Sequence, residues 1–218
     1  MNVPKDKLAM LAVPMIPLQI MLPWIISKYT TGPRPMDLFL KAFPCRLIMG
    51  LVFALVVKLT PSFKMEDGSF PLHYYGLVLF VYALHQVTLY SMFVTVMAFF
   101  ARISDPAVGG TYMTMLNTLT NLGGNWPATL ALWSVDHLTW KKCQFDLGQN
   151  ISSSNVCDGS LETKECEAGG GFCLVEIDGY FVESFACVIF GFLWLALWGW
   201  STVQKLQNAK EKQWRVVK

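Results

Sequence analysis

Long apolar stretches without charge alternate with short polar segments along most of this chain. Between Asp67 and Asp136 only Arg102 and Asp105 carry a formal charge, which leaves apolar runs at 68–101 and 107–135. A helix of about 20 apolar residues crosses the hydrocarbon core of a bilayer, and both runs exceed that length. The pattern predicts two membrane-spanning helices joined by a turn at 102–106.

Three further apolar segments have the composition of membrane spans. The five predicted spans are 8–27, 43–60, 73–101, 107–135 and 180–202. Overall composition agrees, because 54% of the residues are hydrophobic and only 15% are charged. We expect an all-α membrane fold in one domain. A net charge of +2 without a clustered basic and aromatic face argues against nucleic acid as a partner.

The segment 136–179 is polar and rich in glycine, unlike the rest of the chain. It holds Cys143, Cys157, Cys166 and Cys173, and Asn150 begins an Asn-Ile-Ser acceptor for N-glycosylation. Four cysteines allow three disulfide pairings, and the alternative of a zinc site lacks the usual Cys-x-x-Cys knuckles. The two signals together favour a loop in an oxidising compartment, with no metal.

The distribution of Lys and Arg predicts the orientation. Cytoplasmic segments collect basic residues, and with 136–179 in the lumen the basic segments 28–41, 102–106 and the tail 203–218 are cytoplasmic. Residues 1–7 then lie on the lumenal side, although they do not form a cleavable signal peptide. We therefore expect this chain to be part of a longer protein.

Several strings resemble the family of acetyl-coenzyme A transporters of the endoplasmic reticulum membrane, within the major facilitator superfamily. They are VPKDKL at 3–8, YALHQVT at 82–88, SDP at 104–106, GGTYMT at 109–114, NLGGNWP at 121–127 and DGY at 178–180. Proteins of that superfamily have twelve spans in two six-helix halves, so the resemblance implies a major-facilitator-type bundle of which this chain supplies the last five helices. It also implies transport of acetyl-CoA from cytosol to lumen, where the acetyl group serves acetylation reactions.

The resemblance also implies the partners. They are acetyl-CoA as transported substrate, the lipid bilayer, the amino-terminal half of the transporter, and a second copy if the protein is a homo-oligomer; no cofactor or catalytic residue is implied. Three alternatives stay open: a transporter of another anionic solute, a multi-span membrane acetyltransferase with His85 as general base, and a fragment that does not transport. The coupling mode, whether exchange, proton symport or facilitated passage, also stays open.

Polar side chains inside the second and third spans are candidates for the substrate pathway. Acetyl-CoA is large and anionic, so its pathway needs cationic or amide donors and an aromatic surface. Arg46 is the best single cation, and the alternative is an arginine that snorkels to lipid headgroups. His85, Gln86 and Tyr90 form a polar stripe that also suits an interhelical hydrogen bond, and His85 is able to carry a proton.

The fourth span carries the other pathway candidates, which serve either as donors to substrate or as contacts between helices. They are Tyr112, Asn117, Asn121, Asn125 and Trp126. Glycines at 123–124 and Pro127 predict a loosened helix here, of the kind that exposes backbone groups to substrate in transporters. Arg102 and Asp105 in the cytoplasmic turn form either a solvated turn or a gating ion pair.

Overall fold

The structure, a computed structural model, describes residues 13–65, 69–145, 157, 159–210 and 214. The chain divides into two compact units. The first holds Met1–Thr118 and Val188–Lys218, and the second holds Leu119–Cys187. Helix α5 (Gly109–Leu138) and helix α7 (Gly179–Trp194) each begin in one unit and end in the other.

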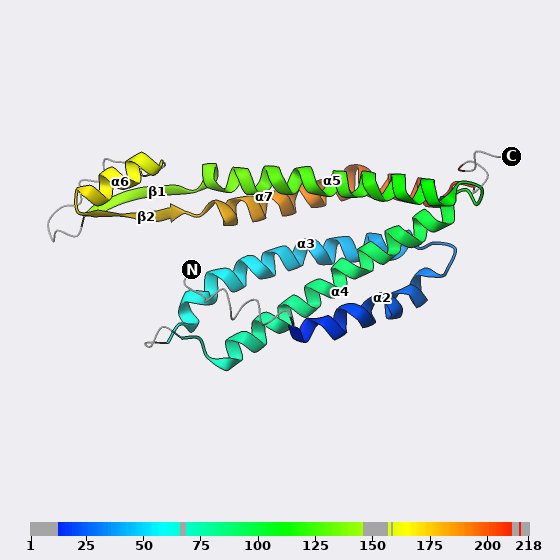
Figure 1. The fold of residues 1–218 in the computed structure, drawn as a ribbon, viewed down its shortest axis with the longest axis horizontal. Coiled ribbons are helices and arrows are strands. Elements are labelled where there is room, and N and C mark those ends of the chain that lie inside the picture. The colour runs from blue at the N-terminus through cyan, green and yellow to red at the C-terminus, as the bar shows by residue number, and fades with distance from the viewer. Residues whose placement is uncertain (1–12, 66–68, 146–156, 158, 211–213, 215–218) are drawn as a thin grey trace. The chain divides into compact units, whose positions relative to one another are not determined.

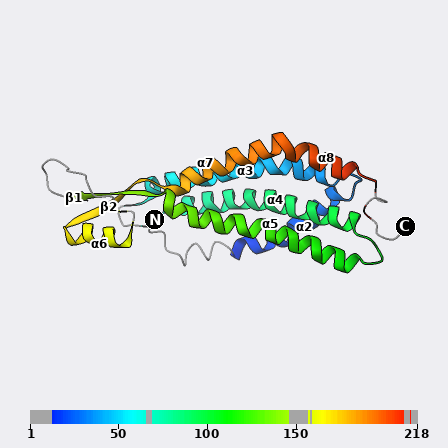
Figure 2. The ribbon, with the colours of Figure 1, turned by 90° about the horizontal axis from the view of Figure 1, so that it is seen from above.

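Three helices form most of the first unit. They are α2 (Ile16–Thr30), α3 (Met36–Leu59) and α4 (Leu72–Ile103), with short 3-10 turns η1 (Val13–Met15) before α2 and η2 (Thr60–Phe63) after α3. Helix α4 packs against both α2 and α3, and the three lie side by side (Figures 1 and 2). At one end of this group the hydroxyls of Thr60 and Tyr74 are 3.0 Å apart and buried, which joins η2 to α4.

The last helical segment contains a π-helical turn that the sequence did not predict. Helix α7 continues through η3 (Leu195–Gly199) into α8 (Trp200–Asn208). Gly199 accommodates the ring of Trp194, because a Cβ at Gly199 would lie 2.6 Å from that ring. A Cβ at Gly191 would likewise lie 2.6 Å from the side chain of Leu47 in α3. A Cβ at Gly199 or Gly191 would thus require the Trp194 ring or the Leu47 side chain to move. π turns often lie at functional positions.

The second unit contains a small sheet where the sequence analysis described only a polar loop. Strand β1 (Trp140–Phe145) pairs antiparallel with β2 (Gly171–Ile177), and Cys143 lies opposite Cys173. Helix α6 (Ser160–Ala168) packs on β2. The protein is thus mostly helical, and this disulfide-containing segment departs from the predicted all-α fold.

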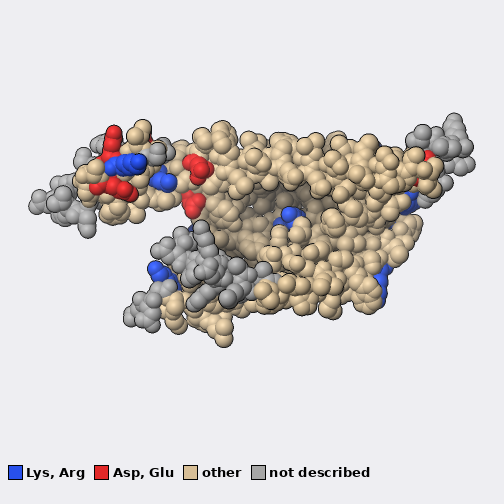
Figure 3. Space-filling model, viewed as in Figure 1, with Lys and Arg blue, Asp and Glu red and all other residues tan. Residues whose placement is uncertain are grey.

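Three described helices are long and apolar enough to cross a membrane. They are Met36–Phe63, Leu72–Ile103 and Gly179–Asn208. Helix α5 matches them in length, but its asparagines and glycines lower its mean hydropathy. The predicted span 8–27 begins outside the described residues, and α2 has 15 residues. On the face drawn in Figure 3, charged side chains gather over β1, β2 and α6 and near helix ends, while the sides of the long helices are almost uncharged.

Candidate functional site

Arg46 lies near the middle of α3. The helix begins at Met36, seven residues before the predicted span, so Arg46 follows ten residues of helix in a total of 24. Ten residues correspond to about 15 Å of helix, which is a long way for a side chain to reach a membrane surface. The side chain is half-buried, and its Nη1 has no hydrogen-bond partner among the described residues. This placement weakens the interpretation of Arg46 as a snorkelling residue.

His85 lies on α4, the helix that packs against α3. Its ring meets the ring of Phe53 edge to face, with centroids 5.2 Å apart. Its Nδ1 is buried and, like Nη1 of Arg46, has no hydrogen-bond partner among the described residues. Phe53 belongs to α3, the helix that also carries Arg46, so the imidazole packs against that helix. The structure thus brings together two predicted site residues from neighbouring helices.

The pair has the chemistry of an anion-binding site. Arginine carries a permanent positive charge and a planar set of N–H donors that match phosphate and carboxylate groups. Nδ1 of His85 donates or accepts a hydrogen bond according to its tautomer. A buried polar group without a partner costs about 1–3 kcal/mol, and a charged group costs more. An anionic ligand at Arg46 would offset that cost.

The remaining polar residues of the third predicted span have different environments. Gln86 is buried with 5% exposure, and Tyr90 is half-buried. The hydroxyl of Thr88 donates to the backbone oxygen of His85 at 2.8 Å, and the hydroxyl of Ser91 donates to that of Val87 at 2.7 Å. The donor of each hydroxyl is therefore used within α4. Gln86 and Tyr90 therefore remain the further candidates on this helix.

Most of the predicted site residues on helix α5 are exposed. Tyr112 is half-buried, whereas Asn117, Asn121, Asn125 and Trp126 are all exposed. The helix continues from Gly109 to Leu138 without the predicted interruption at Pro127. A single proline removes one backbone hydrogen bond, and a membrane helix tolerates that loss. The five side chains stay pathway candidates on the strength of sequence alone.

The turn between α4 and α5 is more ordered than a solvated turn. Asp105 is buried with 3% exposure, and its Oδ1 accepts a hydrogen bond from the backbone N–H of Ala107 at 3.0 Å. The guanidinium of Arg102 donates to the backbone oxygen of Pro33, which joins the end of α4 to the turn between α2 and α3. Asp105 thus shapes the turn, and Arg102 connects two turns at the same end of the unit.

A polar cluster at this end was missed by the sequence analysis. The carboxylate of Asp37 lies 3.3 Å from Nε of Arg34 and accepts hydrogen bonds from Nε2 of Gln204 at 3.3 Å and Nε2 of Gln207 at 2.9 Å. Arg34 also donates to Oε1 of Gln204. The cluster joins the start of α3 to α8. In the sequence, the cluster is indicated only by two pairs of polar residues three positions apart, Arg34 with Asp37 and Gln204 with Gln207.

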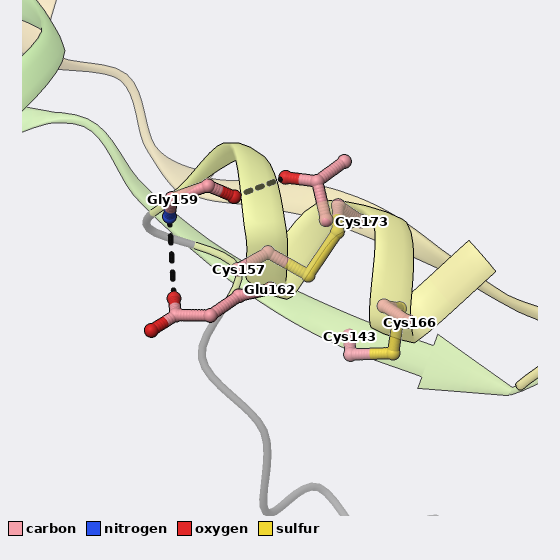
Figure 4. Close-up of a disulfide and its surroundings, with 7 residues drawn as sticks. Cys143, Cys157, Gly159, Glu162, Cys166 and Cys173 are labelled. Carbon is pink, nitrogen blue, oxygen red and sulfur yellow. Dashed lines mark hydrogen bonds between the residues drawn. A yellow bond between two sulfur atoms is a disulfide. The ribbon is translucent and has the colours of Figure 1, made fainter. Parts of the chain in front are cut away.

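The four cysteines of the second unit form two disulfides. Cys143 pairs with Cys166 and Cys157 pairs with Cys173, which selects one of the three pairings that the sequence left open (Figure 4). The sulfurs of Cys143, Cys157 and Cys166 lie within 4.8 Å of one another, a spacing that thiolates binding a metal also show. In this structure each sulfur is part of a disulfide and is not a thiolate ligand. The acceptor Asn150 lies outside the described residues.

Comparison with known families identifies the chain. Residues 34–216 match the family described as Acetyl-coenzyme A transporter 1. The chain belongs to this family. The match covers α3, α4, α5 and the segment from α7 to α8, and so includes Arg46 and His85.

Curated relatives from two yeasts share the same region. An uncharacterized protein of Schizosaccharomyces pombe is 32% identical over 191 residues, covering 88% of this chain and 34% of the relative. An uncharacterized membrane protein of Saccharomyces cerevisiae is 29% identical over 177 residues, covering 81% of this chain and 30% of the relative. The chain therefore spans about a third of the length of these relatives. No solved structure matches it.

Proposed function

We propose that this chain is part of a membrane transporter that carries acetyl-CoA from the cytosol into the lumen of the endoplasmic reticulum. The observation that carries the proposal is the position of Arg46 in this member of the family. Arg46 lies ten residues inside an apolar helix, and its buried Nη1 has no hydrogen-bond partner in the part of the chain that the structure describes. An ionisable residue at such depth is by default a functional residue, because its burial is costly unless it serves a ligand or partner.

The charge of acetyl-CoA fits this site. Its phosphates are multiply charged, and an arginine is suited to bind them through several parallel hydrogen bonds. His85 supplies a second buried polar atom on the neighbouring helix α4, and its ring packs edge to face against Phe53 of α3. We assign Arg46 the role of binding a phosphate and His85 the role of orienting it. Gln86, Tyr90 and the polar residues of α5 are further contacts along the proposed pathway.

The complete transport unit is larger than this chain. Superfamily members place substrate between two halves, and this chain spans about a third of its curated relatives. We propose that the five predicted spans, including α2 and α5, pack against an amino-terminal half. The two disulfides suit a lumenal location for the β1–α6–β2 segment, because disulfides persist in oxidising compartments.

Uptake into liposomes tests the proposal. Labelled acetyl-CoA is added outside vesicles that contain either this chain alone or this chain joined to the upstream helices of a relative. We expect time-dependent accumulation with the joined protein and little with the chain alone. Absence of uptake by both proteins, each folded and correctly oriented, would reject acetyl-CoA as the cargo.

The same vesicles separate the alternatives. Unlabelled acetyl-CoA, free CoA and an unrelated nucleotide are compared as competitors, and only the two CoA compounds should compete strongly. A nucleotide that competes equally well would indicate another anionic cargo. Release of free CoA with transfer of label to an acceptor in detergent solution would instead support a membrane acetyltransferase, for which a general base must contact a bound acceptor.

A further inference from the structure

A small pocket opens at the end of the first unit where α3 begins and α8 lies against it. It has a volume of about 220 Å³ and is lined by Arg34, Asp37, Leu40, Lys41, Trp200 and Gln204. All six residues belong to one compact unit. The pocket lies at the opposite end of α3 from Lys58, and its lining residues on α3 precede Arg46 by five to nine residues. Arg46 is not among the lining residues, so the pocket is a site separate from the proposed transport site.

The charges of the pocket favour an anion. The carboxylate of Asp37 is already compensated by donors from Arg34, Gln204 and Gln207. Arg34 uses Nε and Nη2 in this cluster, which leaves donors on its guanidinium for a ligand. Lys41 is exposed and makes no ion pair or hydrogen bond with any described residue. The unneutralised positive charge of the pocket is therefore concentrated at Lys41.

The apolar lining indicates what kind of molecule carries the anion. Leu40 forms part of the lining and is 2% exposed, while Trp200 is 51% exposed at the end of a membrane-spanning helix. Tryptophans at such positions lie at the level of lipid headgroups. The distribution of Lys and Arg predicts that this end of the unit faces the cytoplasmic leaflet, which is rich in anionic lipids. Basic pockets between helices on that side bind the headgroups of such lipids.

We propose that this pocket binds the headgroup of an anionic phospholipid from the cytoplasmic leaflet. Lys41 contacts the phosphate, Arg34 contributes its free N–H donors, and Trp200 lies along the upper part of the acyl chains. Because Arg34 also holds Asp37 and Gln204, the bound lipid stabilises the attachment of α8 to α3. The proposal concerns the lipid environment and does not depend on which solute is transported.

Binding of a short-chain phosphatidylserine to the delipidated full chain in detergent tests the proposal, with phosphatidylcholine of the same chain length as reference. Lys41→Gln is compared with Lys205→Gln, a matched change at an exposed lysine of α8 outside the pocket. Loss of one lysine near a headgroup corresponds to about fivefold weaker binding. We expect that loss for Lys41→Gln, less than twofold for Lys205→Gln, and no change in either variant for phosphatidylcholine.

Two results would overturn the proposal. Equal losses in the two lysine variants would mean that binding reflects general attraction to a basic surface. In a competition experiment, inorganic phosphate is added to the protein with bound lipid. Displacement of the lipid at phosphate concentrations near the Kd of phosphate itself would mean that the site binds soluble phosphate. Arg34→Gln, checked for folding by circular dichroism, provides a second variant that should also weaken phosphatidylserine binding.

Discussion

Arg46 on α3 and His85 on α4 lie on two helices that pack against each other, and each holds a buried nitrogen without a hydrogen-bond partner among the described residues. Two such atoms on neighbouring helices are unfavourable for folding and favourable for binding an anion. The proposed anion-binding site consists of this pair. The two unpartnered nitrogens are expected to lower the free energy of unfolding and to increase the affinity for an anion. Stability and binding are therefore measured separately.

Replacing Arg46 by leucine should leave the fold at least as stable. A buried charge without a partner opposes folding, and its removal can stabilise by about 1–3 kcal/mol. We expect an equal or higher Tm for Arg46→Leu in detergent. Lys58→Leu, at the exposed far end of the same helix, serves as control for the change in composition. A fall of several degrees in Arg46→Leu alone would mean that Arg46 has a structural partner.

The effects of Arg46→Gln and His85→Gln on acetyl-CoA binding should not add. If both side chains contact one phosphate, removal of either disturbs the contact made by the other. A double-mutant cycle on the equilibrium Kd is then expected to give a coupling energy above about 0.5 kcal/mol. Strict additivity would place the two residues at independent positions along the pathway.

Removing a disulfide should destabilise the β1–α6–β2 segment. The Cys143–Cys166 and Cys157–Cys173 bonds span 23 and 16 residues, and loops of this length correspond to about 3 kcal/mol each. Cys143→Ser with Cys166→Ser should lower the Tm, whereas Cys45→Ser, at a free and exposed cysteine, should not. Peptide mapping without reduction should recover the two stated pairs, and a Cys143–Cys173 peptide would contradict the assignment.

Gly179→Ala should weaken the junction between α5 and α7. A Cβ at Gly179 would lie 2.3 Å from the backbone oxygen of Val135 and 2.8 Å from Oγ1 of Thr139. The same junction holds a hydrogen bond of 3.0 Å from the Gly179 N–H to Oγ1 of Thr139. We expect a loss of about 1–3 kcal/mol, seen as a lower Tm and faster hydrogen exchange at 135–139. Gly76→Ala is the control, because open space surrounds its Cβ position and alanine favours helix; equal stability of the two variants would refute the close packing.

The long apolar segments were well predicted because their signal is local. Helix α4 runs from Leu72 to Ile103, within two residues of the predicted span at each end, since charged and proline-rich segments flank it. Helix α3 begins earlier than its predicted span, because Asp37 and Lys41 in its first turns made that part appear extramembrane. Asp37 is held there by contacts with α8, and those contacts connect residues 167 and 170 positions apart.

The features that sequence reasoning missed depend on residues distant in the chain. The disulfide pairing depends on how α6 packs on the sheet, because Cys143 lies opposite Cys173 in the strand register but bonds to Cys166 of α6. Nor does the sequence indicate that Phe53 covers the ring of His85, because this contact depends on how α3 packs against α4. Arg46 and His85 were predicted as site residues because they are ionisable side chains in apolar segments. Only the structure shows that the two helices that carry them pack against each other.

The role of Arg46 is tested by acetyl-CoA uptake with the chain joined to the upstream helices of a relative, comparing Arg46→Gln with Lys58→Gln. Both variants remove one positive charge from α3, but only Arg46 lies in the proposed site. Loss of a charged hydrogen bond of about 1.5–3 kcal/mol predicts at least tenfold lower uptake efficiency for Arg46→Gln and unchanged uptake for Lys58→Gln. Equal uptake by the two variants and the unmodified protein would contradict the assignment of Arg46 to the acetyl-CoA pathway.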